Sequence, residues 1–86
     1  MKEYNFRTKG TCSRMITFTL DDSGCVHDVE FMGGCNGNLK GIGSLVEGMP
    51  ARDVIDRVAG TTCGPKPTSC PDQLAQALEQ ALKDQA

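Results

Sequence analysis

The chain has 86 residues, of which 38% are hydrophobic and 5% aromatic, and its formal net charge at pH 7 is -2. This length predicts a single domain, residues 1–86, because domains usually run from about 50 to 250 residues. The nearly balanced charge, without runs of one sign, argues against nucleic acid and anionic membranes as partners. The opening MKEYNFRTKG lacks the apolar segment of a signal peptide, and no stretch could span a bilayer, so we expect a cytoplasmic protein.

Three early stretches alternate apolar and polar residues, which is typical of half-buried strands: residues 4–7, 15–20 and 25–31. The turn sequence DDSG joins the second stretch to the third and predicts a hairpin, hence a three-stranded antiparallel sheet. In the third stretch, alternation places Val26, Asp28 and Glu30 on the polar face. It places these residues on the apolar face: Cys25, His27, Val29 and Phe31.

The apolar period then becomes helical. A first helix is indicated by Leu39, Ile42, Leu45 and Val46 and ends near Gly48. Two glycines inside it, Gly41 and Gly43, weaken its helicity, and we expect them to allow close packing on the sheet.

A second helix is predicted from Pro50, in its first turn, to Gly60, with Val54, Ile55 and Val58 as its apolar residues. Ser69 and Asp72 form an S-x-x-D cap for a last helix. Its apolar stripe consists of Leu74, Ala77, Leu78, Ala81 and Leu82. Strands followed by helices predict an α+β fold, with the three helices packed on one face of the sheet.

Four of the five cysteines lie at junctions between predicted elements: Cys12, Cys35, Cys63 and Cys70. The cytosol keeps thiols reduced and an odd count cannot pair fully, so a disulfide framework is disfavoured. If the junctions meet at one end of the sheet, four thiolates converge on one site, which suits zinc or an iron-sulfur cluster. For Cys25 we expect a core filler, and for His27 a hydrogen-bonded or sheet-edge side chain, with metal ligation as the alternative.

The sequence GGCNGN around Cys35 adds a second feature. Backbone N–H groups of Gly34, Asn36 and Gly37, with Asn38 beside them, could donate to cluster or thiolate sulfur, or to an anion such as a nucleotide phosphate. The alternative is a tight turn that aims Cys35 inward. The stiff Pro65-Lys66-Pro67 loop is a candidate docking point for a protein partner.

Two other functions remain open. Cys63 and Cys70 could cycle between dithiol and disulfide, with Cys70 activated by the helix N-terminus. Alternatively, the chain is an adaptor that binds a nucleotide, a cofactor or a reductase, and its cysteines are incidental. No pattern for hydrolysis is present, so we do not expect an enzyme acting on its own.

The stretch TSCPD at 68–72, together with GGCNGNL and TCS, resembles the small four-cysteine members of the TSCPD domain family, over nearly the whole chain. Such domains are similar to the C-terminal region of vitamin B12-dependent ribonucleotide reductases, so the resemblance implies a link to nucleotide reduction, as an accessory to that enzyme. The chain is far too short to house the radical chemistry itself.

A more distant similarity is to iron-sulfur cluster scaffold proteins. Three cysteines resemble those of the scaffolds in their positions: Cys12 precedes the second predicted strand, Cys35 follows the last strand, and Cys70 begins the last helix. The Pro-Lys loop resembles the loop that scaffolds offer to a chaperone. This resemblance implies a scaffold-like fold and a role in cluster delivery. Ser13 stands where scaffolds carry a Gly-Asp pair, and Cys63 is an additional thiol, which favours a closed and firmly held site.

Overall fold

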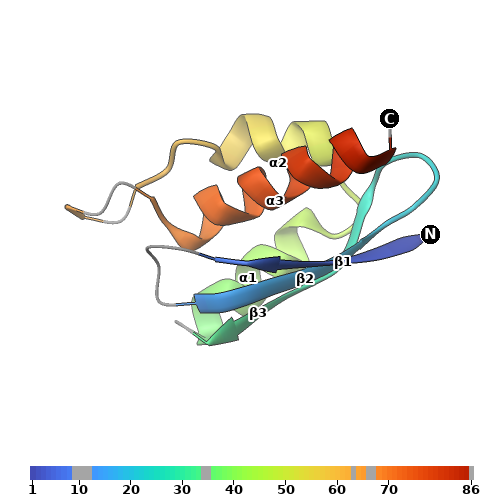
Figure 1. Ribbon diagram of the computed structural model, residues 1–86. Helices are drawn as coiled ribbons and strands as arrows, with labels where there is room; N and C mark the ends of the chain where they lie inside the picture. Colours follow the sequence, from blue (N-terminus) through green and yellow to red (C-terminus); the bar gives the residue numbers. More distant parts are fainter. Residues whose placement is uncertain (9–12, 34–35, 63, 66–67, 86) are drawn as a thin grey trace.

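The computed structural model describes residues 1–8, 13–33, 36–62, 64–65 and 68–85. Three strands come first and pair antiparallel in the order β1-β2-β3: β1 (Lys2–Arg7), β2 (Ser13–Leu20) and β3 (Val26–Gly33). Three helices follow: α1 (Asn36–Val46), α2 (Ala51–Val58) and α3 (Cys70–Gln85). The predicted α+β architecture is confirmed (Figure 1).

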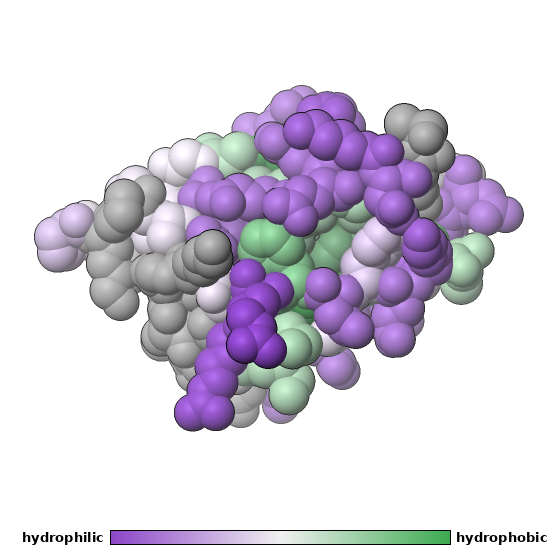
Figure 2. Space-filling view, viewed as in Figure 1, coloured by the Kyte–Doolittle hydropathy of each residue, from purple (hydrophilic) through white to green (hydrophobic). Residues whose placement is uncertain are grey.

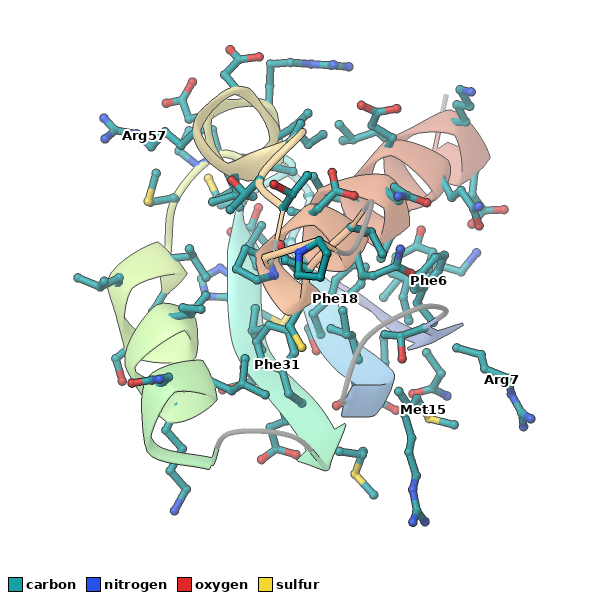
Figure 3. All side chains as sticks on the ribbon, turned by 90° about the vertical axis from the view of Figure 1, so that its left-hand side faces the viewer. Phe6, Arg7, Met15, Phe18, Phe31 and Arg57 are labelled. Atoms are coloured by element: carbon teal, nitrogen blue, oxygen red, sulfur yellow. The ribbon has the colours of Figure 1, made fainter. Side chains whose placement is uncertain are left out.

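The alternation in β2 sorts its side chains between two environments. Ile16, Phe18 and Leu20 are at most 1% exposed and form the floor of the core. On the other face, Thr17 lies between Asn5 of β1 and Glu30 of β3. Figure 3 shows Phe18 beneath the helices and Met15 on the opposite side of the sheet, so the helices cover one face and leave the other open.

The expected assignment of faces in β3 is wrong at its start. Val26 is completely buried, whereas Cys25 precedes the strand and is only half-buried. The cause is an irregularity in the β2–β3 register between Thr17 and Thr19, where Asp28 adopts a positive φ of 55°. Because a bulge adds one residue to the strand, it reverses the alternation, so Val26 and Val29 both face the core.

Helix α1 packs against β3 with only part of the predicted apolar face. Leu39 and Val46 are buried, but Leu45 is 79% exposed, which contradicts its expected place in the core. Gly43 confirms the expectation of close packing, because a Cβ built there would lie 2.8 Å from the Val29 carbonyl oxygen. The same expectation is wrong for Gly41, whose Cβ would meet nothing within 4 Å.

The segment between α1 and α2 pairs with the start of β3. Val26 donates its N–H to the Met49 carbonyl at 2.8 Å and accepts from the Gly48 N–H at 2.7 Å. Pro50, expected in the first helical turn, is the residue just before α2 and forms a bridge with Cys25. This pairing fixes where α2 begins.

Helix α3 completes the core. Leu74 and Leu78 are fully buried, and the predicted stripe of α3 is confirmed, with Leu82 at its margin. Helix α2 packs against α3, and its residues Val54 and Ile55 join the same core. Within the described ranges, no helix combines the length and the apolar character needed to cross a membrane.

Candidate functional site

The start of α3 is built from the TSCPD stretch. Cys70 is the first helical residue and is 7% exposed. The Asp72 N–H donates to the Ser69 hydroxyl oxygen at 3.2 Å, which confirms the predicted S-x-x-D cap. A capping hydroxyl satisfies one of the N–H groups that have no partner within the helix, so Ser69 fixes the first turn and with it the Cys70 backbone.

The same residues hold the loop that leaves α2. The Ser69 hydroxyl donates to the Thr61 carbonyl at 2.6 Å, and the Gly60 N–H donates to the Asp72 carboxylate at 2.7 Å. The Thr68 hydroxyl donates to that carboxylate as well. The hydrogen bonds that the Asp72 carboxylate accepts, first the one from the Thr68 hydroxyl and then the one from the Gly60 N–H, lower the pKa of Asp72 below its ordinary value. The segment just before Cys63 is thereby tied to the segment just before Cys70.

Buried polar side chains reinforce this junction. Those found among the described residues are Thr68, Ser69 and Gln73, each at most 9% exposed. The Gln73 amide donates to the Thr68 hydroxyl oxygen at 3.0 Å. A buried polar group is costly without a partner, so the network specifies one geometry for the helix start. The sequence interpretation found the cap but missed Thr68 and Gln73, because their partners are set by the tertiary structure.

A second junction forms at one end of the sheet. Ser13, the first residue of β2, pairs with Gly33, the last residue of β3. The Thr8 N–H donates to the Arg14 carbonyl at 3.1 Å and closes the β1–β2 hairpin. Cys12 precedes Ser13 in the chain, and Cys35 follows Gly33 by two residues.

Both junctions lie at the same end of the molecule. Figure 1 shows the start of β2, the end of β3 and the starts of α1 and α3 at its left-hand side. Figure 3, viewed from that side, shows the same segment ends facing the reader. The described neighbours of all four predicted ligands therefore lie at one end of the fold.

Several predicted site residues lie outside the described residues: Cys12, Gly34, Cys35, Cys63, Lys66 and Pro67. Pro65 is described and exposed. Considering only the part of the chain that the structure describes, no three His, Cys, Asp or Glu side chains are grouped so that they could hold a metal ion.

The glycine-rich segment after β3 becomes helical sooner than expected. Asn36, Gly37 and Asn38 are the first three residues of α1 and not part of a preceding turn. Gly37 and Asn38 are exposed. First-turn N–H groups have no carbonyl partner within their helix, so they retain the capacity to donate to an acceptor at the N-terminus of α1.

His27 is hydrogen-bonded, as expected. Its Nε2 lies 2.8 Å from Asp21 Oδ2 and its Nδ1 lies 2.7 Å from Glu47 Oε2, so both ring nitrogens face a carboxylate. Glu47 also accepts the Asp28 N–H at 2.9 Å. This cluster links the β2–β3 turn, the start of β3 and the end of α1. Glu47, the second carboxylate, directly follows Val46, and nothing in the sequence indicated that it would contact His27.

Protonation stabilises this cluster in one pH window. The Asp21 hydrogen bond, followed by that of Glu47, raises the pKa of His27 above its ordinary 6.5. The contribution of His27 to stability is therefore full below about pH 6.5 and is lost as pH rises through the raised pKa. The pKa of Asp21 is lowered by His27, and the pKa of Glu47 is lowered chiefly by the Asp28 N–H. Their contributions are lost instead at low pH.

Comparison with known proteins gives one match. The family model described as the TSCPD domain matches residues 2–82. Neither a curated protein nor a solved structure matches the chain significantly. Because the family model covers nearly the whole chain, this protein belongs to the TSCPD domain family.

Proposed function

We propose that the protein is a small metal-binding module, in which the thiolates of Cys12, Cys35, Cys63 and Cys70 hold zinc or an iron-sulfur cluster. One observation carries the proposal: the described residues next to these cysteines lie at a single end of the fold (Figures 1 and 3). Four thiolates meeting there supply the tetrahedral sulfur set that both metals prefer.

The reach of the chain supports the first pair of ligands. Ser13 and Gly33 are cross-strand partners, and partners in antiparallel strands have Cα atoms about 4.5 to 5.5 Å apart. Cys12 is one residue from Ser13, and Cys35 is two residues from Gly33, a span of at most about 8 Å of chain. Their side chains are thus within reach of a common ion.

The hydrogen bonds at the start of α3 support the second pair. The Thr61 carbonyl accepts from the Ser69 hydroxyl, and the two cysteines follow these residues closely in the chain. Cys70 begins a helix of 16 residues, whose N-terminal dipole favours a thiolate over a thiol. Its low exposure keeps water from the metal-sulfur bond.

The start of α1 would complete the surroundings of the site. N–H groups of Gly34, Asn36 and Gly37, with Asn38 alongside, donate to the sulfurs and reduce the repulsion among four negative charges. This role replaces the anion-binding alternative for these residues, since no charged side chain for a phosphate occurs among them.

The test is the metal content of purified protein. We expect one zinc ion or one cluster per chain, measured by elemental analysis and absorption spectra after aerobic and anaerobic purification. Cys70→Ser should lose it, as should the corresponding changes at the other three ligands. Cys25→Ser is the matched control and should keep its full metal content. Cys25 pairs with Pro50 next to the β2–β3 turn and is not one of the four proposed ligands. Metal-free wild type, or full occupancy in Cys70→Ser, contradicts the proposal.

A thiol-disulfide function of Cys63 and Cys70 is the second candidate. It is favoured by the hydrogen bonds that tie the segments carrying them. The double variant Cys12→Ser/Cys35→Ser separates the two candidates, because a redox pair keeps its reducible disulfide and a four-sulfur site loses its metal. The reduction potential and the metal content are measured on the same sample.

The biological setting is a proposal of the same kind. A cytoplasmic location would keep the thiols reduced and available to metal. Similarity to the C-terminal region of the reductases suggests an accessory role in nucleotide reduction, and similarity to scaffold proteins suggests cluster delivery. In either role the Pro65-Lys66-Pro67 loop would be the docking point for the protein partner.

A further inference from the structure

Strand β1 leaves one edge of the sheet open. It is the first strand in the order β1-β2-β3, and no other described segment pairs with its outer side. Its pairing with β2 is continuous from Lys2 to Arg7, without a bulge, and the strand contains no proline. Of the devices that protect an edge from other chains, β1 lacks bulges and prolines but carries charged side chains, so a strand that pairs with it must offer complementary charges.

The hydrogen-bond pattern shows which backbone groups face outward. The Thr8 N–H bonds the Arg14 carbonyl, so Thr8 and Arg14 are a hydrogen-bonded pair. Hydrogen-bonded and non-hydrogen-bonded pairs alternate along an antiparallel ladder. The even-numbered residues of β1 therefore bond β2. The N–H and C=O groups of Glu3, Asn5 and Arg7 point to the open edge.

An apolar groove runs beside this edge. Tyr4 and Phe6 are half-buried and form its apolar floor together with Phe18, Ala77 and Ala81. Polar residues form its rim, where Asp84 of α3 accepts hydrogen bonds from Lys2 and from the Tyr4 hydroxyl. Figure 2 shows apolar side chains in the hollow beside β1, framed by hydrophilic ones. Helix α3 covers this margin of the core incompletely.

We propose that a second copy of the chain binds this edge, with the two β1 strands antiparallel and Asn5 on the twofold axis. Residues whose backbone N–H and C=O groups point to the open edge must pair with the same kind of residue on the other strand. This register is the one that pairs Glu3, Asn5 and Arg7 of both strands. It places Glu3 opposite Arg7 of the partner subunit, twice because of the symmetry. Tyr4 then lies opposite Phe6 of the partner subunit, on the core face.

Charge and shape agree with this register. Opposite charges and aromatic pairs directly across two strands stabilise a sheet, and both occur twice here. Among the described residues, neither Glu3 nor Arg7 has an ion-pair partner within its own chain. The resulting six-stranded sheet would carry the helices of both subunits on one face and would join the two grooves. This surface is independent of the proposed metal site.

Charge reversal tests the register. We expect wild type to sediment as a dimer, and Glu3→Arg and Arg7→Glu each to sediment as monomers, since each places like charges opposite one another. An equimolar mixture of the two variants should form a heterodimer, because one strand then carries two arginines and the other two glutamates. Glu30→Arg, on β3, is the control and should remain dimeric.

Hydrogen exchange gives a second measurement. Amides of Glu3, Asn5 and Arg7 should become protected as protein concentration rises, whereas those of Tyr4 and Phe6 should be protected at every concentration. Circular dichroism checks that each variant is folded. A monomeric wild type over the whole concentration series overturns the proposal. So does a dimer that both reversals leave intact, or a mixture of folded variants that stays monomeric.

Discussion

Two glycines on α1 allow one substitution to be tested in two environments. Gly43→Ala places a Cβ 2.8 Å from the Val29 carbonyl oxygen, whereas Gly41→Ala places one where nothing lies within 4 Å. Alanine is favoured over glycine inside a helix by about 1 kcal/mol at either position. The difference between the two variants therefore isolates the contact between α1 and β3.

The size of the effect follows from the geometry. Ordinary contact begins at 3.4 Å, so α1 must move away from β3 by about 0.6 Å. The Val29 oxygen belongs to the backbone of β3, so it cannot move aside as the end of a flexible side chain could. Overpacking of this kind costs about 1 to 3 kcal/mol. Gly41→Ala should raise the free energy of unfolding by about 0.5 to 1 kcal/mol relative to wild type. The free energy of unfolding of Gly43→Ala should be about 1 to 3 kcal/mol lower than that of Gly41→Ala.

The assay is urea unfolding followed by circular dichroism at the helical band. Both variants should keep the wild-type dependence on urea, and only the midpoints should move, in opposite directions. If Gly43→Ala is stabilised as much as Gly41→Ala, the close approach of α1 to β3 is refuted.

Three further results are expected. Ser69→Ala should lower the free energy of unfolding by about 1 to 2 kcal/mol in urea titrations, because the helix cap and the bond to Thr61 are both lost, and a neutral effect would contradict this role. His27→Gln should remove the fall in melting temperature that wild type shows as pH rises above about 6.5 and the imidazolium loses its proton. If the melting temperatures of wild type and His27→Gln change with pH in the same way, His27 does not stabilise the fold through its two carboxylates. Leu78→Ala should cost about 2 to 5 kcal/mol, whereas Leu45→Ala, at an exposed position, should stay within about 0.5 kcal/mol; similar losses would show that the burial is misassigned.

Local signals accounted for much of the fold. Alternation in β2 identified Ile16, Phe18 and Leu20 as core residues, and the cap before Cys70 located the start of α3. These predictions succeed because strand period and helix capping depend on residues a few positions apart. The prediction for Leu45 failed, since periodicity indicates an apolar face without showing how much of it a neighbour covers.

The candidate site was also predictable only in part. The sequence identified the cysteines at the junctions and led to the expectation that their loops meet. The contacts that hold the junctions came from the structure: Thr68 with Gln73, Gly60 with Asp72, and Ser69 with Thr61. The carboxylate pair around His27 was also invisible beforehand, because Glu47 lies 20 residues away along the chain.

The sequence by itself determined the element types, their order, the core of β2 and α3, and the family. The tertiary structure decided the face of Val26, the exposure of Leu45, the contact beneath Gly43 and the open edge of β1. The physical reason is range. Backbone propensity and side-chain period act over a few residues, whereas a bulge, a buried polar partner or an uncovered edge depends on segments that meet only after the chain has folded.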